Sequence, residues 1–254
     1  MSIAALTGFL LLAGVAAYAQ TLTGFAFGLI TMGGVGLTGL LSLPDAAALV
    51  SVLTLVNASQ MLTKGWRDVA WRQFGLVMLT SLPFLLVGFA LLGWLAGSRA
   101  DLLRLVLGCT IIVSSFQLAR KPQPLDHVSG APSFLFFGGI AGLMGGMFST
   151  SGPPVVYHFY RQPMPHAMVR ETLVTIFAVN ATLRTGLVAS SGQIPSTSTL
   201  TGLLAVPVVM AATHLARRYP PPLTQRALRQ IVFVLLLLSG VALAAPAVIH
   251  LGRV

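Results

Sequence analysis

Long apolar segments, interrupted by short stretches of polar or helix-breaking residues, run along the whole chain. A helix needs about 20 mostly apolar residues to cross roughly 30 Å of hydrocarbon, and most of these segments approach that length. The pattern therefore predicts an all-α, polytopic helical membrane protein with elements at 3–20, 24–41, 45–63, 73–96, 102–119, 132–148, 153–161, 166–188, 199–216 and 230–249.

The first and the seventh of these elements need separate treatment. The first ends in AYAQ, which resembles a signal-peptide cleavage site, but it lacks a positively charged start and its apolar stretch continues past the site. We expect it to stay as a membrane helix. The element at 153–161 is too short to cross a bilayer, so we expect a half-helix that begins after the polar break FSTSGPPVV at 148–156.

Composition supports the membrane class. The chain has 254 residues, of which 56% are hydrophobic and 8% charged, and its mean hydropathy is +0.88. Soluble domains carry about 25% charged residues. The formal net charge of +10 would suggest nucleic acid binding in a soluble protein. Here most basic residues lie in short loops between apolar segments, so the lipid bilayer, and not nucleic acid, is the expected partner.

The basic loops predict the orientation, because cytoplasmic loops are enriched in lysine and arginine. The uncharged loop 190–199 and the nearly neutral stretch 97–101 alternate with the basic ones and are expected in the periplasm. We thus expect a multi-pass protein of the inner (plasma) membrane with both termini outside the cytoplasm. The residues expected at the cytoplasmic side are Lys64, Arg67, Arg72, Arg120, Lys121, Arg217, Arg218 and Arg226.

Several features recur in the same order in the two halves of the chain, at nearly one offset. Such collinear recurrence indicates an internal duplication. The matched pairs are QTLTG at 20–24 with FSTSG at 148–152 (glycines 128 apart), VNAS at 56–59 with VNAT at 179–182 (123 apart), Pro83 with Pro207 (124 apart) and Arg104 with Arg229 (125 apart).

The charge map places the two copies upside down relative to each other, which is typical of secondary transporters. The first repeat, 1–125, is expected to contain a broken-helix hairpin at 3–41 and helices at 45–63, 73–96 and 102–119. The second repeat, 126–254, is expected to contain a hairpin at 132–161 and helices at 166–188, 199–216 and 230–249.

The polar breaks are the candidate site. Hydroxyl residues followed by prolines predict a helix start, since Ser and Thr are good N-caps and Pro is favoured at the first helical position. A helix start inside a membrane leaves unpaired N–H groups and a partial positive charge, which suit an anion. The alternative is that these are packing kinks. The candidate residues of the two breaks are Gln20, Thr21, Thr23, Gly24, Ser149, Thr150, Ser151 and Gly152.

Asn57, Asn180 and Arg184 are polar residues within apolar helices. Each asparagine can act as interhelical glue or as a ligand donor, and their matching positions favour the second role slightly. Arg184 lies one helical turn after Asn180, on the same face. It can snorkel to the periplasmic interface or supply a fixed positive charge to the site.

Arg170 and His158 leave similar alternatives open. Arg170 precedes Glu171, but adjacent helical residues do not share a face, so we do not expect an ion pair between them. Arg170 either reaches the interface or supplies positive charge to an anion. His158, on the half-helix, could carry protons, although a packed or interfacial histidine is the more common case.

The motifs at these residues resemble those of the sulfite exporter TauE/SafE family of membrane permeases. GGMFSTSGPPVV at 145–156 with VRETL at 169–173 is similar to the second-half motif, and QTLTGFAFGL at 20–29 with Leu43–Pro44 is similar to the first. The resemblance implies transport of sulfite, sulfonates, other organosulfur compounds or small organic acids. It implies functional roles for Gln20, Thr21, Thr23, Gly24, Ser149, Thr150, Ser151, Gly152, Pro153 and Arg170.

The sequence therefore predicts a secondary transporter for a small anion, working by alternating access, with no enzymatic activity. It shows no cysteine–histidine cluster or phosphate-loop pattern, so neither a cofactor nor a metal is expected. The substrate and the lipid bilayer are the expected partners, and a homo-oligomer is compatible with the chain. One alternative is a non-transporting scaffold subunit. Another is an intramembrane serine hydrolase that uses Ser149 or Ser151 with His158.

Overall fold

The computed structural model describes residues 2–119, 123, 125–191, 196–219 and 225–251. Every regular element in these ranges is a helix, which confirms the predicted all-α class. Seven helical segments of the described chain are long and apolar enough to cross a membrane. The helices are α1 (Ile3–Thr23), α2 (Phe27–Thr38), α3 (Leu43–Gly65), η1 (Trp66–Asp68), α4 (Trp71–Ser98), α5 (Ala100–Ala119), α6 (Ala131–Phe148), α7 (Pro153–Tyr160), α8 (His166–Ser190), α9 (Thr197–Gly202), α10 (Ala205–Arg218) and α11 (Gln225–Leu251).

Local sequence sets several of these boundaries. Ser42 begins α3, because its hydroxyl accepts a hydrogen bond from the Asp45 N–H (3.2 Å) and Pro44 occupies the first turn. Gly39 ends α2 in the left-handed conformation (φ 65°), which glycine adopts without steric cost. Local residues thus set the end of α2 and the start of α3.

One predicted helix, 199–216, is wrong as a continuous element. The structure divides it into α9 and α10 at Leu203 and Leu204, where N–H groups bond to carbonyls three residues back. Pro207 explains the interruption, since its ring clashes with the carbonyl of the residue four positions earlier, Leu203. Pro83 does not divide α4 in the same way, because α4 continues through it.

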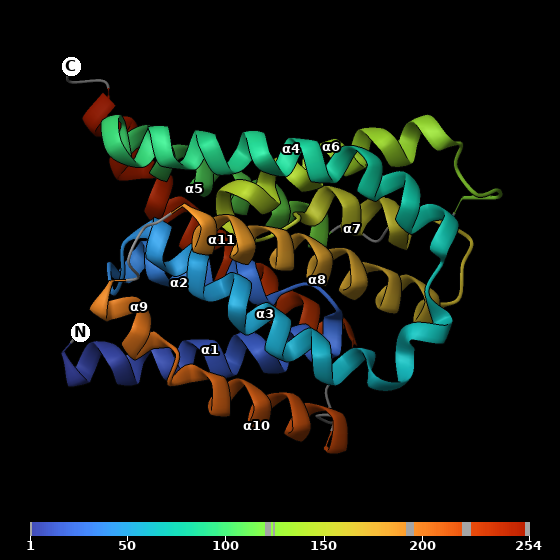
Figure 1. Ribbon diagram of the computed structural model, residues 1–254, viewed down its shortest axis with the longest axis horizontal. Coiled ribbons are helices and arrows are strands. Elements are labelled where there is room, and N and C mark those ends of the chain that lie inside the picture. Colours follow the sequence, from blue (N-terminus) through green and yellow to red (C-terminus); the bar gives the residue numbers. More distant parts are fainter. Residues whose placement is uncertain (1, 120–122, 124, 192–195, 220–224, 252–254) are drawn as a thin grey trace.

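The helices lie side by side along the long axis of the molecule (Figure 1). α3 and α8 are in contact and run in opposite directions through the middle, α3 from left to right and α8 from right to left. α4 packs on α6, α5 on α11 and α1 on α10. The start of α1 and the end of α11 lie at the left end of the view, and η1 lies at the right end.

The packing of α6 against α4 relies on small residues. Gly138, Gly142 and Gly146 recur every fourth residue on α6, and a Cβ on any of them would clash with the backbone of α4. Small residues at this spacing let transmembrane helices approach closely. This contact fixes the position of the helix that ends at the second break.

Part of the charge map used for orientation lies outside the described residues. This applies to Arg120 and Lys121 and to residues 192–195 of the neutral loop.

Candidate functional site

The first break lies between α1 and α2. Gly24 ends α1 with φ 86°, and α2 begins at Phe27. Thr21 and Thr23 lie in the last turn of α1 and bond back to the carbonyls of Ala17 and Ala19 (both 2.8 Å). They therefore do not start a helix, contrary to the sequence interpretation. Their hydroxyls are occupied by the preceding turn, a common arrangement for Ser and Thr in membrane helices.

Gln20 and Asn57 hold this break together. The Gln20 side-chain oxygen Oε1 accepts the Phe27 N–H (2.9 Å), and Gln20 Nε2 donates to Asn57 Oδ1 (3.1 Å). Asn57 Nδ2 donates to the hydroxyls of Thr21 (3.1 Å) and Thr213 (2.8 Å). Gln20 thus acts as a remote cap for α2, seven residues before the helix starts. Asn57 ties α1 to α3 and α10, as interhelical glue does.

The second break lies between α6 and α7. α7 begins at Pro153, as predicted, and Gly152 precedes it with φ 80°. The hydroxyl residues are not N-caps, however. Ser149 is the C-cap of α6, in the left-handed conformation (φ 54°). The N-cap of α7 is Gly152, so no side chain caps the start of that helix. Ser149 instead donates to the Ala47 carbonyl of α3. The prediction of serine caps is wrong because tertiary partners take these hydroxyls.

Asn180 fixes the second break much as Asn57 fixes the first. Its amide nitrogen donates to the hydroxyls of Ser151 (2.8 Å) and Ser81 (2.9 Å), and the Ser81 hydroxyl lies 3.1 Å from its carbonyl oxygen. Asn180 is on α8, Ser151 is in the break and Ser81 is on α4. Each asparagine thus connects the break of its own half of the chain to a helix of the other half.

Arg184 is buried beside the second break. Its side chain is 1% exposed, its Nε donates to the Gly146 carbonyl (3.0 Å), and its Nη1 donates to the Ser51 hydroxyl (3.2 Å). Ser51 in turn lies 2.6 Å from the Ser149 hydroxyl. Among the described residues, no carboxylate pairs with Arg184. The snorkelling alternative is therefore wrong, since the guanidinium lies inside the bundle at the end of α6.

The two breaks are in contact. A Cβ on Gly28, in the first turn of α2, would lie 2.7 Å from Thr150 Cβ and 3.3 Å from the Ser149 carbonyl oxygen. Neither helix start has an N-cap side chain, at Ala26 or at Gly152. The first-turn N–H groups of a helix have no partner within that helix. Phe27 bonds to Gln20, and the next amides of α2 lie beside the second break, whereas α7 begins with Pro153 and Pro154, which have no N–H.

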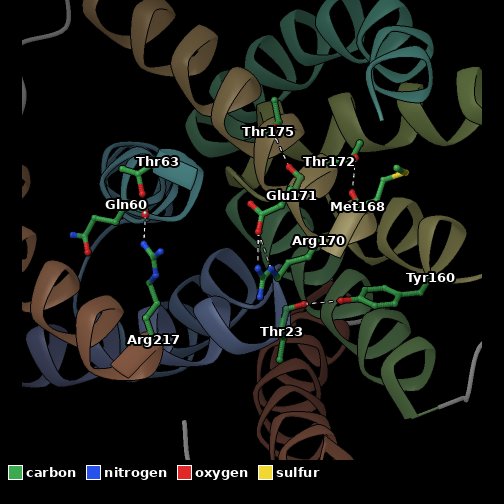
Figure 2. Close-up of polar contacts among 10 residues, drawn as sticks. All are labelled: Thr23, Gln60, Thr63, Tyr160, Met168, Arg170, Glu171, Thr172, Thr175 and Arg217. Atoms are coloured by element: carbon green, nitrogen blue, oxygen red, sulfur yellow. Dashed lines mark hydrogen bonds and ion pairs between the residues drawn. The ribbon is translucent and has the colours of Figure 1, made fainter. Parts of the chain in front are cut away.

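Arg170 lies beside the first break. Its Cγ would be 3.1 Å from a Cβ on Gly24. Its Nε and Nη2 both donate to Glu171 Oε1, at 3.0 and 2.7 Å (Figure 2). The expectation of no ion pair is therefore wrong, because the long arginine side chain curls around the helix to reach its neighbour. Tyr160 of α7 donates to the Thr23 carbonyl (3.0 Å) and closes this corner.

His158 is a packed side chain and not part of either break. Its ring stacks on Phe137 at 4.4 Å and meets Phe134 edge-on at 4.7 Å. Its Nε2 lies 3.5 Å from the hydroxyl of Ser133, which is its hydrogen-bond partner. Ser149 and Ser151 bond to other groups. The serine–histidine pair that a hydrolase needs is therefore not formed.

A surface pocket of about 420 Å³ lies away from the breaks, at the ends of α3 and α10. Its lining contains no predicted site residue. The lining residues are Gln60, His214, Arg217 and Arg218.

Sequence reasoning missed several residues that bind the predicted ones. Ser51, Ser81 and Thr213 are buried hydroxyls inside apolar helices, and a search for such isolated hydroxyls would have found them. Glu171 was seen, but its ion pair with Arg170 was not expected.

Known proteins resemble this chain over most of its length. The sequence profile of the family described as sulfite exporter TauE/SafE matches residues 9–243. The chain belongs to the sulfite exporter TauE/SafE family. The family resemblance seen in the break motifs is thereby confirmed, and a TauE/SafE protein is a membrane transporter and not an enzyme.

Two curated relatives of this TauE/SafE protein are informative. A protein of Cupriavidus necator named probable sulfite/organosulfonate exporter TauE is 39% identical over 243 residues, which cover 96% of this chain and 95% of the relative. A protein of Comamonas testosteroni named probable inner membrane transporter protein TsaS is 32% identical over 218 residues, which cover 80% of this chain and 83% of the relative. No solved structure matches the chain significantly.

Proposed function

We propose that this TauE/SafE protein is a secondary transporter that carries a small anion by alternating access. The anion is sulfite, a sulfonate, or another organosulfur or organic acid anion. It is held where the two helix breaks meet, near the middle of the membrane. The printed name of the Cupriavidus relative, a sulfite/organosulfonate exporter, supports this substrate class.

The buried guanidinium of Arg184 is the main support for this proposal. A guanidinium buried in a membrane protein is costly unless an anion or polar groups compensate it. Here a carbonyl, a hydroxyl and the face of the Phe89 ring do so, and no described carboxylate does. The net positive charge is therefore left for an anion that enters the bundle.

Backbone amides are the second source of attraction. The asparagine and glutamine side chains are already bonded to protein groups, so they shape the breaks instead of receiving the anion. The donors left for it are the first-turn N–H groups of α2 that follow Phe27, because Pro153 and Pro154 at the start of α7 have no N–H. Helix N-termini attract anions through these donors and through the helix dipole. Thr150 contacts Gly28 and Arg184 bonds to the end of α6, whereas Arg170 lies against Gly24 at the first break.

We further propose that residues 1–125 and 126–254 are inverted repeats. The contacts support this, because exchanging the halves turns the α1–α10 pair into the α6–α4 pair and leaves the α3–α8 and α5–α11 pairs unchanged. The left-handed residues Gly24 and Ser149 are 125 positions apart, close to the offsets of the other matched pairs. This register replaces the 128-residue match of Gly24 with Gly152. The basic end at η1 would be cytoplasmic, with both termini on the opposite side.

The test is stabilisation of the purified protein by sulfite, methanesulfonate, sulfate and acetate. A ligand at a hundredfold excess over its Kd stabilises the folded state by about 2.7 kcal/mol. We expect one class of anion to raise the melting temperature of the native protein. Arg184→Met should lose this shift, whereas Arg104→Met, at an exposed arginine of α5 paired with Asp101, should keep it. An equal shift in a folded Arg184→Met protein would contradict the proposed site.

A further inference from the structure

Glu171 is a buried carboxylate with only half of its hydrogen-bonding capacity used. The residue is 3% exposed. Both bonds from Arg170 go to Oε1, and Oε2 has no hydrogen-bond partner. The Arg170 side chain is 45% exposed and that of Glu171 is 4% exposed, so the cation of this pair is open to a second ligand and the anion is not.

Among the side chains that the structure describes, Arg170 is the one cation bonded to Glu171. α8 packs against α3, α4, α6, α7 and η1. Gly65 of α3 lies so close to Oε2 that a Cβ there would clash. None of the titratable neighbours with a described side chain bonds to Glu171. The groups at this end of the bundle are Lys64, whose side chain is not described, and Arg67, Asp68, Arg72, Tyr160 and His166.

Arg170 connects this carboxylate to the first break. Its stem lies against Gly24, and the neighbouring Thr23 carbonyl is held by Tyr160. An anion arriving at the break would compete with Glu171 Oε1 for the same guanidinium donors, Nε and Nη2. A bidentate arginine contact is among the stronger ways to bind a sulfonate or carboxylate, so the exchange is favourable for the anion.

We propose that Glu171 binds a proton each time an anion takes Arg170 from it, so that anion and proton cross together. This inference rests on the proposed function. A buried carboxylate deprived of its cation is neutralised by protonation, because the unpaired charge costs more than the neutral acid. The proton comes from water and binds a Glu171 oxygen while the anion replaces that oxygen on Arg170. On release of the anion, Arg170 returns to Glu171 and the proton leaves. For a monovalent anion the cycle moves no net charge.

The experiment measures proton uptake on anion binding. Methanesulfonate is a suitable probe because it stays ionised throughout the accessible pH range. In weakly buffered detergent solution, the native protein should take up about one proton per anion bound, and its affinity should fall about tenfold per pH unit as the pH rises above neutrality. Glu171→Gln should bind methanesulfonate with no proton uptake and with affinity independent of pH. Asp101→Asn, at an exposed acid on α5, should behave like the native protein.

The outcomes separate this inference from the proposed function. Anion binding without proton uptake in the native protein would overturn the coupling and leave the anion site intact. Unchanged proton uptake in Glu171→Gln would also overturn it. Failure of the native protein to bind any anion of the panel would remove the proposed function and the coupling with it.

Discussion

At the scale of single residues, two asparagines and one arginine organise the breaks. Asn57 and Asn180 each donate hydrogen bonds to two hydroxyl groups, and these bonds join segments that no backbone hydrogen bond connects. Arg184 adds charge at the same depth, bonded to the end of α6. In hydrocarbon every unpaired polar group is costly, and such junctions therefore determine where irregular backbone can exist.

Removing Asn180 should loosen the second break. Asn180→Ala leaves the Ser81 and Ser151 hydroxyls without their shared partner, and we expect a loss of about 1–2 kcal/mol in stability. Thr182→Ala is the matched control on the same helix, because its exposed hydroxyl bonds only to the Ala178 carbonyl. It should change stability by less than about 0.5 kcal/mol. Denaturation of both variants in detergent measures the difference, and equal losses would contradict this role for Asn180.

At the scale of elements, the site depends on the start of α2 lying against the break that precedes α7. α2 and α7 are the second arms of the two hairpins, and the first turn of α2 rests on Thr150. Gly28 makes this contact feasible because it has no side chain to separate the two chains. The close approach places the first-turn amides of α2 beside Ser149 and Thr150 of the second break.

A side chain at Gly28 should separate the breaks. Gly28→Ala places a Cβ 2.7 Å from Thr150 Cβ, and overpacking of this kind costs about 1–3 kcal/mol. We expect a lower melting temperature and a smaller shift with anion. Gly93→Ala is the control, since nothing lies within 4 Å of a Cβ there.

The double variant Gly28→Ala with Thr150→Gly removes the clashing atom and should recover part of the lost stability. If the stability losses of Thr150→Gly and Gly28→Ala simply add in the double variant, Gly28 is not needed for the contact between the breaks.

At the scale of the whole molecule, sequence pattern predicted the helices well and their tertiary bonds poorly. The start of α7 at Pro153 and the break after α1 follow from local chemistry, so they were predictable. The roles of Ser149 and Arg170 were not. Ser149 bonds to α3 instead of capping α7, and Arg170 bends to its neighbour. The first outcome depends on a helix about a hundred residues away in sequence, and the second on how a long side chain bends, which helical spacing does not describe.

The interruption at Leu203 illustrates the same limit in the backbone. Pro207 was visible in the sequence, but Pro83 leaves α4 continuous while Pro207 separates α9 from α10. Proline removes one hydrogen bond in both helices, and the surrounding packing decides whether the helix bends or breaks.

The central claim is that the anion binds where the two breaks meet, and locating a heavy-atom sulfonate tests it most directly. Crystals of the protein grown with 2-bromoethanesulfonate would place the bromine by anomalous diffraction. The account predicts a peak between the start of α2 and residues 149–152, close to Arg184, and its loss in Arg184→Met. A peak found only in the surface pocket lined by Gln60, His214, Arg217 and Arg218 would contradict it.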